Sequence, residues 1–161
     1  MRIKTEESGT VPLVCDLDLD RYLGKWYEIG KLPARGQMGL DNVTAVYTLL
    51  GNGRIRVRNE GFRNGKMRGI TGSAWQRDKR CHGGLHVRFF WPFKGEYNVI
   101  MMASDYSYAV VMGDTRSSLW ILSRTPEMKK EDARDILRFL HGQGFDIQRI
   151  TKTRQERTVR S

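Results

Sequence analysis

The stretch that decides the fold is DLDRYLGKWYEIGKLP, residues 18–33. It is too polar for a core strand and too rich in aromatic residues for a linker. Gly24 lies where the pattern changes, and Trp26 and Tyr27 follow closely. Because glycine permits a tight entry that a side chain would obstruct, we expect a turn at Gly24 that leads into a first strand.

Short runs with alternating apolar and polar residues continue from about residue 24 to residue 124. Eight runs predict strands: KWYEIGKL, VTAVYTLL, RIRVRNEGF, GITGSAWQR, GLHVRFFWPF, EYNVIMMAS, YAVVMGD and SLWILSRT. The separators at 51–53, 63–66 and 114–118 are typical of hairpin turns. Such a meander favours an all-β, eight-stranded antiparallel up-and-down barrel, in which no edge is left unpaired.

The pattern changes once after the strands. In residues 125–145 the apolar positions recur at helical spacing, at Ala133, Ile136, Leu137 and Leu140. We therefore expect one amphipathic helix packed on the outside of the barrel. FDIQRI, residues 145–150, predicts a short final strand, and residues 151–161 predict a disordered basic tail.

Length and composition bound the architecture. A chain of 161 residues, 39% apolar and 29% charged, predicts one soluble domain over residues 1–161, with a core at about 16–151 and flexible ends at 1–14 and 152–161. No segment approaches the roughly 20 apolar residues that cross a bilayer. The opening MRIKTEESGT lacks the apolar middle of a secretory signal, which leaves a cytosolic protein and a removed leader both open. Two cysteines leave one disulfide or two separate thiols open.

The formal net charge of +10 raises the question of an acidic partner. Arg54, Arg56 and Arg58 alternate along one run, so they are expected on the outer face of a strand. That pattern is first of all a solvated face. A basic surface module for acidic lipid or nucleic acid is the alternative.

Alternation also supplies the residues that face the interior. If the three arginines face water, Val57 and Asn59 face inward. If His86 and Arg88 face water, Val87 and Phe89 face inward together with Leu85. On the strand VTAVYTLL, residues 43–50, we expect Ala45 and Tyr47 to face inward. On the last strand we expect Trp120, Leu122 and Arg124 to face inward. Leu119 and Ile121 then face outward, where the helix packs. The alternation does not settle the facing of Trp75, Trp91, Tyr97 and Tyr108.

Three segments carry a family resemblance. GKWYEI at 24–29, SDYSYAVV at 104–111 and LWILSRTP at 119–126 resemble, in order and spacing, the three short motifs of the lipocalins. The similarity is closest to the bacterial outer-membrane and apolipoprotein D-like lipocalins, and it extends over residues 18–151. It implies that Trp26 closes the barrel floor, with Gly24 at the entry and the guanidinium of Arg124 across the indole.

The resemblance also implies where a ligand binds. Tyr47, Asn59, Phe89 and Trp120 occupy positions that line the cavity of apolipoprotein D-like lipocalins. With the alternation, the expected ligand-binding set is Ala45, Tyr47, Val57, Asn59, Val87, Phe89 and Trp120. The loop LPARGQMGLDN at 32–42 departs from relatives: Gly36 and Gln37 replace bulky residues, which predicts a wider entrance. In the lipocalin layout the segments that hold Cys15 and Cys81 approach each other at the closed end, so the resemblance implies that these two cysteines could pair.

The expected function is non-enzymatic binding and transport or storage of a small hydrophobic ligand. By resemblance this ligand is a fatty acid or a lysophospholipid, with its anionic head near a basic rim. A tetrapyrrole or other flat ring compound is the alternative ligand, although His82, His86 and His141 are not expected inside. We expect no catalytic residues, cofactor or metal, because no nucleophile elbow or phosphate loop is present.

The expected partners follow from the same features. Inward aromatics and outward arginines separate the two components of a single-strand site, so no specific nucleic acid is expected. Peripheral contact with an anionic membrane is compatible with the charge. We expect a monomer or weak homodimer, in the periplasm or outer membrane if a leader is removed and otherwise in the cytoplasm.

Overall fold

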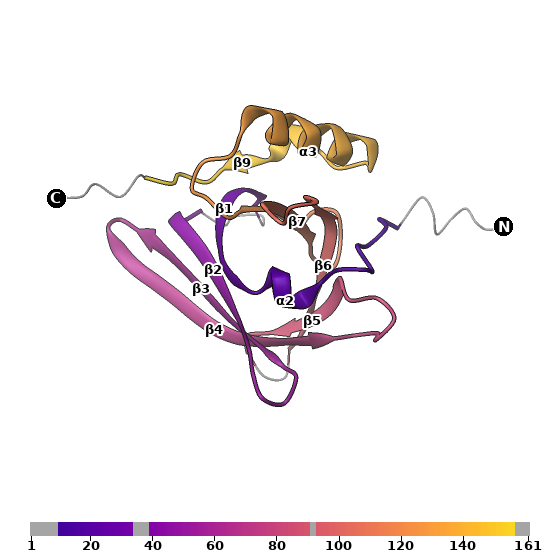
Figure 1. Cartoon of the computed structure of the whole chain (residues 1–161). Coiled ribbons are helices and arrows are strands. Elements are labelled where there is room, and N and C mark those ends of the chain that lie inside the picture. The colour runs from indigo at the N-terminus through magenta and orange to yellow at the C-terminus, as the bar shows by residue number, and fades with distance from the viewer. Residues whose placement is uncertain (1–9, 34–38, 91–92, 157–161) are drawn as a thin grey trace.

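The computed structural model describes residues 10–33, 39–90 and 93–156. Its antiparallel strands run in the order β2-β3-β4-β5-β6-β7-β8-β1-β9, and β1 also pairs with β2, which closes the barrel seen in Figure 1. The strands are β1 Gly24–Leu32, β2 Asp41–Leu49, β3 Ile55–Arg63, β4 Lys66–Gln76, β5 Gly84–Arg88, β6 Gly95–Met102, β7 Tyr108–Met112, β8 Leu119–Ser123 and β9 Thr151–Lys152. The helices are α2 Leu19–Tyr22, α3 Lys130–Gly142 and the 3-10 turn η1 Ile147–Arg149.

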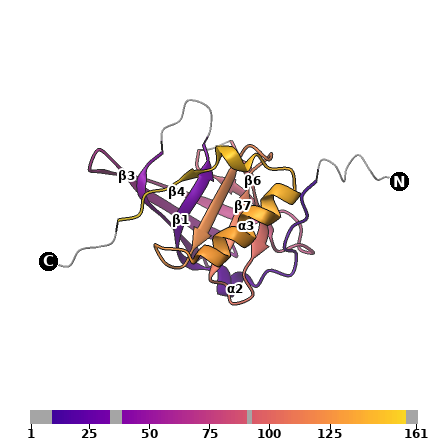
Figure 2. The same cartoon turned by 90° about the horizontal axis from the view of Figure 1, so that it is seen from above.

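This architecture confirms the predicted fold, an eight-stranded up-and-down barrel with one helix outside. Figure 2 shows α3 lying across the barrel wall. Two hydrophobic clusters result, one inside the barrel and one under the helix. On β8, Leu122 and Trp120 pack with the inner cluster, while Leu119 and Ile121 pack with Ile136 of the helix, as their alternation predicts. Among the described residues, no helix is long and apolar enough to cross a membrane.

The floor of the barrel is built around the opening stretch. Asp18 caps α2 by accepting bonds from the backbone N–H groups of Asp20 and Arg21, and the helix lies across one end of the barrel (Figure 1). Gly24 then turns the chain with a φ of 101°, a left-handed conformation that favours glycine. Trp26 follows, fully buried.

Arg124 lies over the floor tryptophan. Its guanidinium carbon is 3.7 Å from the centre of the Trp26 ring. Its N–H groups donate to the carbonyls of the turn that joins α2 to β1, at Arg21, Tyr22, Leu23 and Lys25. A planar cation both stacks and caps free carbonyls here, so one side chain ties β8 to the start of β1.

A β-bulge in β1 changes which residues face inward. Glu28 pairs with Leu122 and Gly30 pairs with Ile121, so Ile29 is an extra residue. Beyond the bulge, Lys31 therefore lies opposite the inward residue Trp120. Simple alternation from Trp26 would have directed Lys31 outward.

The C-terminal predictions were wrong in two respects. Residues 145–150 contain the 3-10 turn Ile147–Arg149, and the final strand comes afterwards, at Thr151–Lys152. Residues 152–156, predicted as part of a flexible end, are held in place: the backbone N–H of Thr153 donates to Ile29, and the side-chain amide of Gln155 donates to the carbonyls of Glu28 and Val43.

The physical reason lies in the separation of β1 from β2. These strands pair only from Gly24 to Tyr27, and β9 pairs with β1 at Gly30 and Lys31. The segment 151–156 therefore supplies the hydrogen bonds that β2 no longer provides. The sequence pattern of this segment is polar, so it gives no sign of such a role.

The N-terminal prediction also needs correction. Residues 10–14 were expected in a flexible end, but Val11 is buried and the N–H of Val14 donates to the carbonyl of Val99. A disulfide joins Cys15 to Cys81, with Cα atoms 3.9 Å apart. The N-terminal segment is thereby attached to the connection between β4 and β5.

Candidate functional site

The barrel encloses a cavity of about 290 Å³. It is lined by residues of seven strands and the residue after β5: Glu28, Lys31, Val43, Thr44, Ala45, Tyr47, Val57, Asn59, Val87, Phe89, Glu96, Tyr97, Val111, Trp120 and Leu122. All seven residues of the expected ligand-binding set lie on this wall. The cavity is mostly apolar with a few convergent polar groups, as is typical of small-molecule sites.

Three tyrosines close the inner end of this cavity. The hydroxyl of Tyr97 donates to that of Tyr47 at 2.7 Å, and the hydroxyls of Tyr22 and Tyr97 share a second hydrogen bond. Burial raises the pKa of Tyr47 to about 12 and also raises the pKa values of Tyr22 and Tyr97, so all three hydroxyls stay protonated at neutral pH. Beyond the tyrosines only about 10 Å³ remains open, next to Ile55 and Ala74. The cavity is therefore blind at the floor end.

Two of the three charged residues on the cavity wall, Glu28 and Lys31, come from β1, and the third, Glu96, comes from the start of β6. Glu28 is buried and accepts a hydrogen bond from the hydroxyl of Thr153, and desolvation by burial raises the pKa of its carboxyl. Lys31, three residues on, lies on the same cavity wall because of the bulge. Its positive charge lowers the pKa of Glu28, but this effect is smaller than that of burial. An ammonium group thus stands near the mouth, with a carboxyl deeper inside.

The structure settles the facing of three aromatic residues. Tyr97 faces the cavity. Trp75 faces outward, with the guanidiniums of Arg54 and Arg88 at 4.2 and 5.0 Å from its ring. Tyr108 packs with the cluster under α3. The separation of outer arginines from inner aromatics is therefore incomplete at Trp75. Trp91 lies outside the described residues.

Among the charged and aromatic residues of the site, sequence reasoning missed Tyr22, Glu28, Lys31 and Glu96, and it left the facing of Tyr97 open. Glu28 could have been found, because it alternates with Trp26 on the same strand. Tyr97 alternates with Val99 in the same way. Lys31 depends on the bulge and Tyr22 on a short helix that crosses the barrel end, and neither has a clear local signal.

Other predicted features lie elsewhere. His86 packs against Trp75 on the outer face, and His82 bonds the carbonyl of Leu17 at the closed end. No histidine lines the cavity as described, and the described residues form no cluster of three or more His, Cys, Asp or Glu suited to a metal. The expected wide entrance depends on Gly36 and Gln37, which lie outside the described residues.

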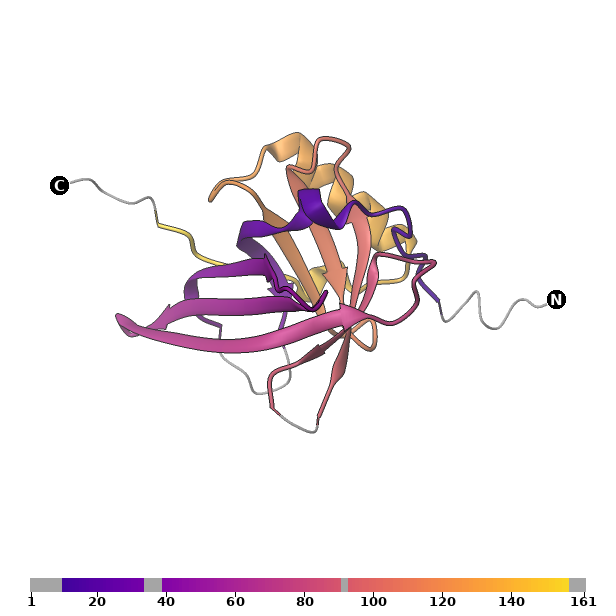
Figure 3. The ribbon, with the colours of Figure 1, turned by 60° about the horizontal axis from the view of Figure 1, so that its bottom comes forward.

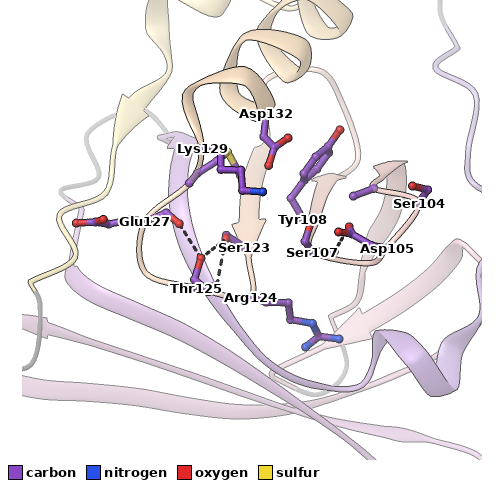
Figure 4. Close-up of a pocket in the computed structure, with 12 residues that line it drawn as sticks. Ser104, Asp105, Ser107, Tyr108, Ser123, Arg124, Thr125, Glu127, Lys129 and Asp132 are labelled. Atoms are coloured by element: carbon purple, nitrogen blue, oxygen red, sulfur yellow. Dashed lines mark hydrogen bonds between the residues drawn. The ribbon is translucent and has the colours of Figure 1, made fainter.

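A second, polar pocket of about 370 Å³ lies outside the barrel between β7, β8 and the start of α3 (Figure 4). Its groups bond mainly to one another: the hydroxyl of Thr125 donates to the carbonyl of Glu127, and the N–H of Ser107 donates to Asp105. A wider groove of about 610 Å³ runs beside α3 over Ile29 and Ile150. The barrel cavity remains the best candidate site because several strands direct apolar side chains into one enclosed space.

The fold and the site define a class of protein: an antiparallel barrel with a plugged floor, an outer helix and an internal apolar cavity. Comparison with known families gives the particular one. The model of the lipocalin-like domain matches residues 17–155, so this chain belongs to the lipocalin family.

Similar proteins come from bacteria, plants and animals. The chain is 38% identical over 147 residues to the outer membrane lipoprotein Blc of Escherichia coli K12, covering 90% of this chain and 83% of Blc. It is 38% identical to temperature-induced lipocalin-1 of Arabidopsis thaliana, covering 94% and 87% of the two chains. It is 33% identical to mouse apolipoprotein D, covering 89% and 80%.

Solved structures support the fold. Lobster apocrustacyanin A1 superposes with a TM-score of 0.75 at 16% identity, covering 93% of this chain and 89% of that one. The cockroach allergen Per a 4 gives a TM-score of 0.70 at 19% identity, covering 93% and 96%. At such low identity these likenesses bear on the fold alone.

Proposed function

We propose that this lipocalin binds a small hydrophobic ligand in its barrel cavity and carries or stores it without chemical change. The observation that carries the proposal is the apolar cavity inside the barrel, on whose wall all seven expected ligand-binding residues lie. The strands that line it close into one barrel, so no second copy is needed to complete the site, and the proposed form is a monomer or weak homodimer. Burial of an acyl chain is worth about 0.8 kcal/mol per methylene group.

The ligand that fits best is an acyl chain with an anionic head, as in a fatty acid or lysophospholipid. Val57, Val87 and Phe89 provide an apolar wall, and the ammonium of Lys31 lies toward the mouth, where a head group would stop. Glu28 also faces the cavity, but its raised pKa makes its carboxyl easier to neutralise, which reduces repulsion of an anion. Asn59 and Trp120 can add orienting hydrogen bonds.

The compartment that fits best is the periplasm or the outer membrane. A disulfide persists in oxidising compartments, and Cys15 and Cys81 form one here. The similarity to an outer membrane lipoprotein points the same way.

The test is a titration with saturated fatty acids of increasing length, read by displacement of a fluorescent fatty-acid probe. Affinity should rise about fourfold per methylene and level off once the cavity is full. Ala45→Phe fills the cavity and should weaken binding of long acids at least about tenfold. Val46→Phe, its neighbour on the outer face, is the matched control and should bind as the wild type does. Equal weak affinity at every length, or full affinity in the Ala45→Phe protein, would contradict the proposal.

A further inference from the structure

The exposed hydrophobic side chains of this barrel are concentrated at one end. Six large ones are strongly exposed among the described residues, and four belong to two connections. Phe90 and Phe93 follow β5, with exposures of 68% and 76%. Phe62 and Met67 flank the turn between β3 and β4. Clustered exposure of this kind marks an interaction surface more often than chance.

Both connections lie at the open end of the barrel. In an up-and-down barrel successive strands run in opposite directions, so the β3–β4 and β5–β6 connections share one end. That end is opposite the floor formed by α2 and Trp26. Figure 3 shows the β3–β4 hairpin extending from the body of the barrel.

The same two connections are basic. Arg63, Lys66 and Arg68 lie around the β3–β4 turn, and residues 62–68 contain no acidic side chain. Lys94 follows Phe93 directly. Phenyl rings combined with lysine and arginine suit the boundary between the head groups and acyl chains of an anionic bilayer.

An open groove leads from these rings to the cavity. It has a volume of about 340 Å³, and its lining includes Phe90, Phe93 and Lys94 together with one acidic residue of the β7–β8 connection, Asp114. It shares Val87, Phe89, Glu96 and Trp120 with the wall of the barrel cavity. Anything seated on the exposed rings therefore lies beside the entrance.

We infer that the open end docks on an anionic phospholipid bilayer, with Phe90 and Phe93 at the acyl boundary and the basic β3–β4 hairpin reaching the head groups from the same end of the barrel. The net charge of +10 favours such a surface. A second copy of the chain fits less well, because a two-fold interface would bring the same cationic residues face to face. This docking goes beyond ligand binding and does not depend on what the cavity holds.

The test is flotation of the full chain with vesicles of phosphatidylcholine alone, or with roughly 30% phosphatidylglycerol added. We expect binding to the anionic vesicles and much weaker binding to the neutral ones. The double variant Phe90→Ser/Phe93→Ser should partition at least about tenfold less. The matched control Leu49→Ser/Leu137→Ser removes two exposed side chains away from the mouth and should bind as the wild type does.

A second pair of variants tests the charges. Lys66→Glu/Arg68→Glu should weaken binding at least about tenfold, whereas Lys79→Glu/Lys130→Glu, with the same change in net charge away from the mouth, should weaken it much less. Wild-type protein that stays in solution with anionic vesicles would overturn the inference. Unchanged binding of the Phe90→Ser/Phe93→Ser protein would also overturn the inference, because the phenyl rings would then contribute nothing and charge alone would explain the binding.

Two further results separate this inference from its rivals. If sedimentation velocity shows a dimer that Phe90→Ser/Phe93→Ser dissociates, while vesicles capture no wild-type protein, the surface binds a second copy and bilayer docking is wrong. The Ala45→Phe protein, designed to lose acyl-chain binding, should still float with anionic vesicles. Docking and ligand binding can therefore fail independently.

Discussion

At the scale of single residues, Glu28 in the cavity wall makes the stability of the fold depend on pH. Its carboxyl is desolvated inside the barrel wall, so its pKa in the folded protein lies above the ordinary value of 4.5. Between these two pKa values the folded chain holds more protons than the unfolded chain. The contribution of Glu28 to stability is therefore present below about pH 4.5 and is lost as the pH rises through the folded pKa.

Glu28→Gln tests this coupling, because the amide cannot ionise but keeps an oxygen that accepts the Thr153 hydroxyl. The free energy of unfolding of the variant, relative to the wild type, should rise with pH above 4.5 and become constant above the folded pKa. Urea titrations between about pH 4 and pH 8 measure it. Glu131→Gln, in the exposed first turn of α3, is the control. A difference that is independent of pH, or that falls as pH rises, would refute the coupling.

At the scale of elements, the C-terminal segment completes the barrel wall. A chain ending at Lys152 should be less stable than one ending at Glu156 by about 2–4 kcal/mol, because it loses the side-chain bonds of Thr153 and Gln155 to β1 and β2. Urea denaturation of the two truncated chains measures the difference. Since both lack residues 157–161, the comparison isolates residues 153–156. Equal midpoints would mean that β1 and β2 need no such support.

The elements also show how far sequence reasoning reaches. Alternation identified the inner faces of β3 and β5, because arginines or histidine on one side leave valine and phenylalanine for the other. On β8 it placed Trp120 and Leu122 inside and left Leu119 and Ile121 for the helix, which the two clusters confirm. It could not place Lys31, since a bulge after Glu28 shifts the alternation by one residue. It could not place Thr153 either, because a polar segment that fills a gap between two distant strands has no periodicity of its own.

At the scale of the whole molecule, the Cys15–Cys81 disulfide links the N-terminal segment to the connection between β4 and β5. It spans 66 residues, and removing a link of that length should cost about 4 kcal/mol through the added freedom of the unfolded chain. The double variant Cys15→Ser/Cys81→Ser should therefore unfold at clearly lower urea. Reductant should lower the midpoint of the wild type to that of the variant and leave the variant unchanged. A wild type indifferent to reductant would show that the link adds nothing.

The three tyrosines at the base of the cavity determine the direction in which a ligand enters and leaves the barrel. Because the tyrosines close the floor end, a bound ligand leaves through the same open end by which it entered. Any part too long for the space stays outside, at the rim. The part that protrudes is accessible to another molecule or to a lipid bilayer, which can bind it and extract the ligand.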